Sequence, residues 1–386
     1  MKSATGNAVV KQKNRVKTAM YILDHDGVSR QELAIALGFS MPTVFQNVSD
    51  LIDAGLVCEN GEYGSTGGRK AKILTIRQGV RCALGVEITG HHVRLILMDL
   101  SRKLMDIEQK RFCYEDTTAY YMELGRIVQD FVKKNNVGPD AECTLVGVGI
   151  ALPGIIDPAR KLLQKSHALN VENVGLWQFE QNIPYPVLFG NDANLAAYAE
   201  VKDKQKNSVY LSLNDTVGGA IYQNGDINLG DNFKSGEIGH MILVPGGKKC
   251  YCGKRGCLDA YCSAKVLRLD ENDRSLSRFF DGLENGDGDC VKRWDVYLDH
   301  LSIMVSNLRM AFDCDIILGG HVGGFMGGHM RTFGDKIRKY NNFEADTSYI
   351  HLGQYKRECA SIGAARQVID WYIGNLNLDN VSARSQ

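Results

Sequence analysis

The chain has no net charge, because 45 lysines and arginines balance 45 aspartates and glutamates among its 386 residues. A neutral chain sets up no global field that would attract nucleic acid or a membrane surface, although a local patch still can. The sequence also has no signal peptide and no apolar run long enough to cross a bilayer. We therefore expect a cytoplasmic protein with no membrane partner, long enough for two or three domains.

The cysteine spacing of a disulfide-rich protein is lacking as well. Most of the eleven cysteines are scattered through the chain, which favours a reducing compartment. The exception is a short segment that contains one histidine and three cysteines. These four side chains are His240, Cys250, Cys252 and Cys257.

Segment 240–257 has the composition of a metal site. The four glycines inside it supply bends that let the four side chains converge. Thiolates and imidazole favour tetrahedral zinc, and four protein ligands leave no open position for a metal-bound water. The sequence therefore predicts a structural zinc. Free thiols in a glycine-rich loop are the alternative.

The N-terminal part of the chain has the pattern of a DNA-binding unit. Residues 14–27 carry apolar side chains at helical spacing, and Ser29 with Glu32 forms a capping box that starts a second, short helix. After a turn at Gly38, Ser40 is placed to cap a third helix. Two short helices joined by a tight glycine-containing turn form a helix-turn-helix.

The third helix and the segment after it supply the candidate DNA contacts. The expected outer face of the helix carries uncharged hydrogen-bonding side chains, which we place in the major groove: Thr43, Gln46 and Asn47. Two strands of a wing follow, and in the glycine-rich stretch beside them Arg69 and Lys70 are expected to contact phosphate or the minor groove. These features predict a winged helix-turn-helix over residues 1–78, bound as a homodimer or tetramer to a palindromic double-stranded operator. A small helical bundle with no ligand is the alternative.

Beyond residue 82 the pattern changes to strands that alternate with helices. Strands are predicted over 83–88, 93–98, 144–151 and 187–189, and again over 209–213, 218–222 and 316–318, with long helices over 120–133 and around 294–312. Two α/β halves of this kind predict sheets flanked by helices, with ligands in the crevice at the strand ends.

Four short segments of this body carry a family resemblance. They are Pro153-Gly154, Asn191-Asp192-Ala193-Asn194, Gly236-Glu237-Ile238-Gly239-His240 with the cysteine run after it, and Ile317-Leu318-Gly319-Gly320. Together they resemble the ROK family (repressors, open reading frames and sugar kinases) over roughly residues 82–372. The winged helix-turn-helix resembles the repressor branch of that family, of the xylose- and N-acetylglucosamine-repressor type. The resemblance implies a two-lobed actin-like, ribonuclease-H-like fold over residues 79–386, with a sugar between the lobes.

Polar side chains near strand ends form the predicted sugar site. A sugar is a ring of hydroxyls, so its site needs carboxylates and amides that each bond two neighbouring hydroxyls. The candidates are Gly154, Asn191, Asp192, Glu237, His240 and Asp259. His240 would use one ring nitrogen for zinc and the other for the sugar. The role of Asp259 is implied by the resemblance alone, and the family usually has Glu there. Loop capping is the alternative for any one of these residues.

Two turns distinguish a sugar kinase from a sugar sensor. In ROK kinases an Asp-x-Gly-x-Thr-like turn and a glycine-rich turn hold the ATP phosphates. Here Glu87, Thr89 and His91 replace the three residues of the first turn, and Asp215 brings a negative charge into the second. Asp192 matches the general base of the kinases, but a base without a phosphate donor site transfers nothing.

The sequence therefore predicts a sugar-responsive repressor of carbohydrate-metabolism genes that has no catalytic residue and no enzymatic activity. An ATP-dependent sugar kinase with an appended DNA-binding domain is the alternative, and Asp192 would then be its catalytic residue. A regulator that docks on another protein is a third possibility, to which nothing in the sequence points.

Overall fold

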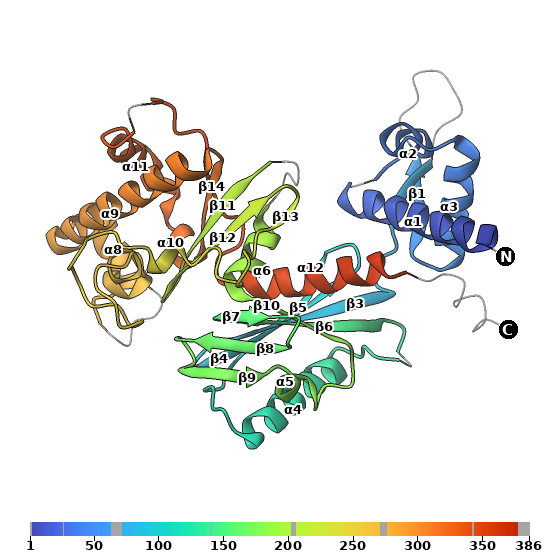
Figure 1. Ribbon diagram of the computed structural model, residues 1–386, viewed down its shortest axis with the longest axis horizontal. Coiled ribbons are helices and arrows are strands. Elements are labelled where there is room, and N and C mark those ends of the chain that lie inside the picture. The colour runs from blue at the N-terminus through green and yellow to red at the C-terminus, as the bar shows by residue number, and fades with distance from the viewer. Residues whose placement is uncertain are drawn as a thin grey trace.

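The computed structural model describes residues 2–25, 27–62, 72–139, 141–201, 206–270, 276–341 and 343–376. Within these ranges a small N-terminal unit precedes two larger α/β lobes, each built on a five-stranded sheet (Figure 1). No helix in these ranges is both long and apolar enough to span a bilayer.

The N-terminal unit contains three helices and a two-stranded antiparallel sheet. Its elements are α1 (Lys2–Asp24), α2 (Arg30–Leu37), α3 (Met41–Asp53), β1 (Val57–Glu62) and β2 (Lys72–Ile76). The predicted capping box is present, since the Ser29 hydroxyl accepts the Glu32 N–H and the Glu32 carboxylate accepts the Ser29 N–H. The first helix begins earlier than predicted, because its polar first turns carry no apolar stripe that would mark them in the sequence.

Helix α3 is held in this unit by its apolar stripe and by the ion pairs that Asp50 forms with Arg15 and Lys11 of α1. Val44, Val48 and Leu51 are fully buried, as their spacing predicts. On the flank of the same helix, Asp50 accepts a salt bridge from the Arg15 guanidinium of α1 at 2.6 Å. These contacts fix one face of α3 and leave the other to solvent.

The first lobe has a mixed sheet in the order β10-β6-β3-β4-β5. The strands are β3 (Arg81–Ile88), β4 (His92–Asp99), β5 (Leu104–Arg111), β6 (Thr144–Leu152) and β10 (Val187–Asn191). Helix α4 (Thr118–Lys134) covers one face of this sheet and α12 (Cys359–Gly374) the other. A smaller antiparallel sheet extends the lobe and is followed by α5 (Trp177–Glu180); its strands are β7 (Ile155–Asp157), β8 (Leu162–Ser166) and β9 (Val171–Gly175).

The second lobe repeats this design with the strand order β13-β12-β11-β14-β15. The strands are β11 (Ser208–Leu213), β12 (Val217–Gln223), β13 (Asp226–Ile227), β14 (Asp315–Gly319) and β15 (Ile350–Leu352). Its helices are α7 (Asp259–Cys262), α8 (Ser277–Glu284), α9 (Gly288–Phe312), α10 (Gly320–Gly323) and α11 (Met330–Ile337). The alternation of strands and long helices predicted from the sequence is thus confirmed in both lobes.

Helices α6 (Asp192–Glu200) and α12 cross between the two sheets, and their closest approaches depend on glycine. A Cβ on Gly363 of α12 would lie 1.8 Å from the Leu195 carbonyl oxygen of α6, and a Cβ on Gly85 of β3 would lie 1.9 Å from the Ser361 oxygen of α12. No larger residue fits at either place, so the two helices and the first sheet form one tightly packed block.

The N-terminal unit rests on this block at the C-terminal end of α12 (Figure 1). Arg102, in the turn between β4 and β5, reaches Asp24 of α1 at 2.8 Å and Asp370 of α12 at 2.7 Å. Arg81 adds a hydrogen bond of 3.1 Å to the Ala54 carbonyl at the end of α3. The contacts of Arg102 with Asp24 and of Arg81 with the end of α3 therefore position the N-terminal helices on the first lobe.

Candidate functional site

The four predicted metal ligands come together in the second lobe. The ligand atoms of His240, Cys250, Cys252 and Cys257 all lie within 4.8 Å of one another. Cys250 Sγ is 3.7 Å from His240 Nδ1, and Cys252 Sγ is 3.8 Å from Cys257 Sγ. A tetrahedron with bonds of about 2.3 Å has edges of about 3.8 Å, so these side chains fit a zinc-sized ion.

The loop that carries these ligands has little freedom to move. Its backbone is bridged between Ile242 and Cys257 and between Lys249 and Arg255. A Cβ on Gly256 would lie 1.9 Å from the Val244 carbonyl oxygen, so the two sides of the loop touch. The ligand geometry is therefore fixed by the surrounding backbone.

A cavity of about 920 Å³ lies between the two lobes. Five of the six predicted sugar ligands line it: Gly154, Asn191, Asp192, Glu237 and His240. They come from the ends of β6 and β10, the start of α6 and the turn before the metal loop, which lie far apart in the sequence. The predicted convergence of these strand ends is present in the structure.

Asn191 lines the cavity and also holds two of its walls together. Its Oδ1 accepts the Asn194 N–H at 3.0 Å and caps α6, while its Nδ2 donates to the Gly154 carbonyl at 3.0 Å. Gly154 has a φ of 124°, and a Cβ there would lie 2.4 Å from the Lys165 carbonyl oxygen. Asn191 thus ties the first-lobe turn to the helix that carries Asp192.

Two carboxyl groups in the cavity have raised pKa values. Burial and the neighbouring Glu87 carboxylate raise the pKa of Asp192 to about 7, against the Ala193 N–H, which lowers it. Enclosure by the cleft also raises the pKa of Glu237, and the Lys254 ammonium partly offsets this. With its pKa near neutrality, the Asp192 carboxyl group can accept from or donate to hydroxyls, which suits a polyhydroxy ligand.

The predicted sugar contact of Asp259 does not hold in the structure. Its side chain is 5% exposed and does not line the cavity. The carboxylate instead accepts the Val217 N–H at 2.6 Å, at the start of β12. The Asp259 side chain, which is one methylene shorter than the usual Glu, thus anchors the backbone at the start of β12. Burial raises the pKa of Asp259 to about 6.

Several cavity residues were not predicted from the sequence. Tyr251 lies between Cys250 and Cys252 in the sequence and lines the cavity. Its hydroxyl lies 3.3 Å from His240 Nε2, the ring nitrogen other than the Nδ1 that lies beside Cys250. His167 from the first lobe faces His240 with the ring centroids 5.8 Å apart. The position of Tyr251 inside the cysteine motif was a usable signal, but nothing local to His167 marked it.

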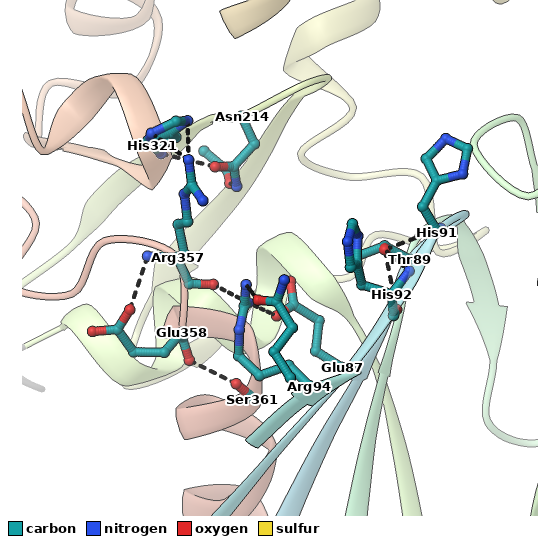
Figure 2. A network of polar contacts seen from close by, with 12 residues as sticks. Glu87, Thr89, His91, His92, Arg94, Asn214, His321, Arg357, Glu358 and Ser361 are labelled. Carbon is teal, nitrogen blue, oxygen red and sulfur yellow. Dashed lines mark hydrogen bonds and ion pairs between the residues drawn. The ribbon is translucent and has the colours of Figure 1, made fainter. Parts of the chain in front are cut away.

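The turn after β3, where a kinase of this fold would hold phosphate, is closed by its own side chain. Thr89 Oγ1 accepts the His92 N–H at 3.0 Å and the His91 N–H at 3.4 Å, so these amides already have a partner. The His91 side chain is exposed and points away from the neighbouring network (Figure 2).

A chain of charged groups crosses from the first lobe to the second beside this turn (Figure 2). Arg94 pairs with Glu87 and donates to the Arg357 carbonyl. The Arg357 guanidinium in turn lies 2.8 Å from His321 Nε2 at the start of α10. Asn214 Oδ1 accepts the His321 N–H at 2.8 Å. The backbone N–H groups of the turn after β3 and of His321 therefore already donate to protein side chains, and side chains fill the space that a bare phosphate-binding turn would leave open.

In the second turn, which contains Asp215, the carboxylate is paired within the protein. Asp215 forms an ion pair with Arg268, whose side chain is largely buried. The carboxylate remains half exposed, and its neighbours Asn214 and Thr216 line the cavity. The turn thus carries an ion-paired side chain where a phosphate-binding turn would present bare backbone.

The exposed face of α3 carries two of the three predicted base contacts. Gln46 is exposed and donates to Asp50 Oδ1 at 2.6 Å, and Thr43 is half exposed beside the capping Ser40. The prediction for Asn47 is wrong: its side chain is 2% exposed and donates to Thr18 Oγ1 of α1 at 3.1 Å. Its one-residue offset from Gln46 turns it about 100° toward the core.

Arg69 and Lys70 lie outside the described residues. The described part of the N-terminal unit adds one feature that the sequence analysis missed. Phe45 is 54% exposed on α3, and the Arg30 guanidinium lies 5.1 Å from the centroid of its ring. An exposed aromatic ring on this face can pack against a thymine methyl group.

Two sheet-based lobes around a ligand cleft define a mixed α/β fold of the sugar-kinase type. A sequence profile of the ROK family matches residues 83–370. The chain belongs to the ROK family, and the proteins that it resembles in sequence include repressors of that family.

The sequence relatives are identical to this chain at a quarter or more of the aligned positions. The xylose repressor of Bacillus spizizenii is 28% identical over 264 residues, which cover 67% of both chains. The xylose repressor of Caldicellulosiruptor bescii is 25% identical over 360 residues, 87% of this chain and 89% of that protein. The DNA-binding transcriptional dual regulator NagC of Escherichia coli is 27% identical over 270 residues, 67% of this chain and 64% of that protein.

Solved structures share the fold. A ROK family transcriptional regulator, a homologue of the E. coli MLC protein, superposes with a TM-score of 0.73 at 19% identity and covers 97% of this chain and 100% of its own. A ROK family glucokinase from Streptomyces griseus in complex with glucose and AMPPNP has a TM-score of 0.61 at 20% identity, over 74% of this chain and 98% of its own. The fold match with the regulator extends over nearly the whole chain, whereas that with the kinase leaves about a quarter of it unmatched.

Proposed function

We propose that this protein is a sugar-responsive transcriptional repressor of carbohydrate-metabolism genes, acting in the cytoplasm. Residues 1–78 form its winged helix-turn-helix, and residues 79–386 its sugar-binding body. The observation that carries the proposal is the combination, in one chain, of a cavity lined by amide and carboxyl groups and a helix, α3, whose outer face is exposed. The repressors among its relatives and the regulator of similar fold support the same assignment.

In the proposed complex, α3 enters the major groove of a palindromic operator. Gln46, Thr43 and Phe45 contact base edges, and β1 and β2 form the wing. Arg69 and Lys70 in the wing segment are proposed to contact the DNA backbone or minor groove. A helix-turn-helix protein normally reads two half-sites, so we propose a homodimer or a tetramer.

The effector is proposed to bind between the lobes. Asn191, Asp192 and Glu237 offer amide and carboxylate groups to the hydroxyls of one sugar ring, with Gly154 and His240 at its edge. A structural zinc held by the four ligands of loop 240–257 would fix His240 and the turn that carries Glu237. With four protein ligands, the metal supplies shape rather than a reactive water.

Sugar phosphorylation is the second candidate, because Asp192 stands where a kinase of this family has its base. Three features argue against it. The Thr89 turn is closed by its own side chain, the contacts of Arg94, Arg357 and His321 cross from one lobe to the other, and the second turn holds the ion pair of Asp215 with Arg268. We therefore propose that the body senses sugar and does not phosphorylate it.

Thermal-shift screening against a panel of free sugars tests the sensor proposal, because a ligand that binds only the folded state raises the melting temperature. The proposal expects at least one sugar to raise it in wild type and to leave the Asp192→Ala variant unchanged. ATP consumption in the presence of that sugar, abolished in Asp192→Asn, would instead support the kinase.

A further inference from the structure

We propose a second ligand subsite at the far end of the same cavity, which takes a second sugar ring, so that the effector is a disaccharide or a longer saccharide. This inference rests on the proposed sugar-sensing function and goes beyond it. The subsite, called the distal arm, is lined by Leu195, Tyr198, Ile227, Leu229, Gln367 and Trp371.

The distal arm is continuous with the predicted sugar site along one face of α6. Asn191, Asn194 and Tyr198 follow one another at helical spacing, and all three line the cavity. Because an α-helix rises about 1.5 Å per residue, Tyr198 lies about 10 Å along α6 from Asn191. A single ring held at Asn191 and Asp192 does not reach that far.

The volume of the cavity also exceeds the need of one ring. At about 920 Å³ it lies near the upper end of the range for ligand pockets, roughly 300–1,000 Å³, which enclose molecules of drug size. A monosaccharide bound to the polar end would leave the distal arm to solvent. The arm is therefore available to a second group attached to the first ring.

Two amide side chains add polar groups to this face of the cavity. Gln367 lines the arm, and Asn194 lines the cavity between the arm and the predicted sugar site. Side-chain amides donate to and accept from sugar hydroxyls. Asn194 Oδ1 and Gln367 Oε1 are shielded from solvent and have no hydrogen-bond partner among the described residues, so each amide must turn before its oxygen meets a ligand.

Aromatic and aliphatic side chains complete the arm. Trp371, which is 37% exposed, and Tyr198 line it from α12 and α6, and Ile227 and Leu229 line it from the segment around β13. The C–H face of a pyranose ring packs on such apolar surfaces, and the hydroxyls at the edge of the ring can bond side-chain amides. The Tyr198 hydroxyl is already used, since it donates to Asp370.

Isothermal titration calorimetry of the full-length protein with matched sugar pairs tests this subsite. The pairs are xylose with xylobiose, glucose with cellobiose, and N-acetylglucosamine with chitobiose. We expect at least one disaccharide to bind about tenfold or more tightly than its own monosaccharide. Trp371→Ala should remove this gain, and Trp371→Phe should restore part of it. Trp177→Ala, at an exposed tryptophan that does not line the cavity, is the matched control and should keep the gain.

Three results would overturn the subsite. In the first, every disaccharide binds no more tightly than its own monosaccharide. In the second, Trp371→Ala weakens the binding of both members of a pair equally. In the third, adenosine binds saturably to wild type and this binding is lost in Trp371→Ala, so that the arm takes a nucleoside and not a sugar ring. In the first two cases, monosaccharide binding that is lost in Asp192→Ala would leave the proposed sugar sensor standing. If no sugar of the panel binds wild-type protein, both the subsite and the sensor are contradicted.

Discussion

The Arg102 guanidinium lies 2.8 Å from the Asp24 carboxylate and so joins the first lobe to the first helix of the N-terminal unit. The same guanidinium bonds Asp370 of α12, which also accepts the hydroxyl of Tyr198 at the edge of the cavity. A continuous set of polar contacts thus leads from the ligand cavity to α1. A ligand that moves α6 or α12 would alter these contacts, which is one physical route from sugar to DNA.

Breaking this route should uncouple the two ends of the protein. In Arg102→Ala we expect sugar affinity to stay near the wild-type value, while the ratio of operator affinities with and without sugar moves toward one. Calorimetry with sugar and fluorescence anisotropy with labelled operator measure the two quantities separately. Arg126→Ala, which removes a solvent-exposed pair with Glu123, is the matched control. An unchanged ratio in Arg102→Ala would exclude this route.

The metal site should contain one zinc ion per chain in protein purified without chelator. Cys252→Ser should remove the ion, lower the melting temperature and weaken the sugar response, because the same loop positions His240 beside the cavity. Elemental analysis and thermal denaturation measure both effects. Cys113→Ser, at an exposed cysteine outside the site, should change neither. Protein without stoichiometric zinc that keeps a full sugar response would contradict the assignment.

Neighbouring residues on α3 should behave differently when changed to alanine. Gln46→Ala should relax base preference at one operator position, at a cost of about 1–3 kcal/mol, with little change in stability. Asn47→Ala should instead destabilise the N-terminal unit by about 1–3 kcal/mol, because it leaves the buried Thr18 hydroxyl without this partner. Binding to a set of operator variants and urea unfolding distinguish the two effects. A change in base preference without a loss of stability in Asn47→Ala would contradict the observed burial.

The raised pKa of Asp192 predicts a pH dependence with a definite sign. The group titrates near 3.8 when unperturbed and at about 7 in the folded protein, so the folded state holds the proton more tightly. Its contribution to stability is present at acid pH and is lost as the pH rises from about 4 toward 7 and beyond. The difference in melting temperature between wild type and Asp192→Asn should therefore change across this window, with wild type losing stability relative to the variant. A constant difference would contradict the pKa shift.

Local signals in the sequence predicted the parts of the site that depend on local chemistry. The four ligands of the metal loop and the capping box at Ser29 and Glu32 each follow from residues a few positions apart. Asn191 was predicted to contact the sugar, and the structure also realises the alternative for it, since its side chain caps α6. The seven strands and two long helices predicted for the two lobes followed from their periodicity for the same reason, whereas β5 and α12 were not predicted.

The errors and omissions involve contacts between distant segments. Asn47 and Asp259 are polar residues at positions that suit DNA and sugar contacts. In the structure, however, Asn47 bonds Thr18 of α1, and Asp259 bonds the Val217 N–H at the start of β12. The distal arm joins α6 to α12, so Gln367 and Trp371 gave no signal near the motifs of the sugar site. Such pairings are set by tertiary packing, which a single sequence does not reveal.

The most direct test of the account is operator binding measured with and without sugar, in the absence of ATP. Operator duplexes selected from random DNA by the protein itself, and the sugar found by thermal-shift screening, serve as probes. We expect the sugar to change wild-type operator affinity by roughly 10- to 100-fold, consistent with a coupling free energy of about 1–3 kcal/mol. Asp192→Ala and Glu237→Ala should bind the operator as wild type does without sugar, and neither should respond to it. A normal sugar response in both variants would contradict the placement of the effector between the lobes.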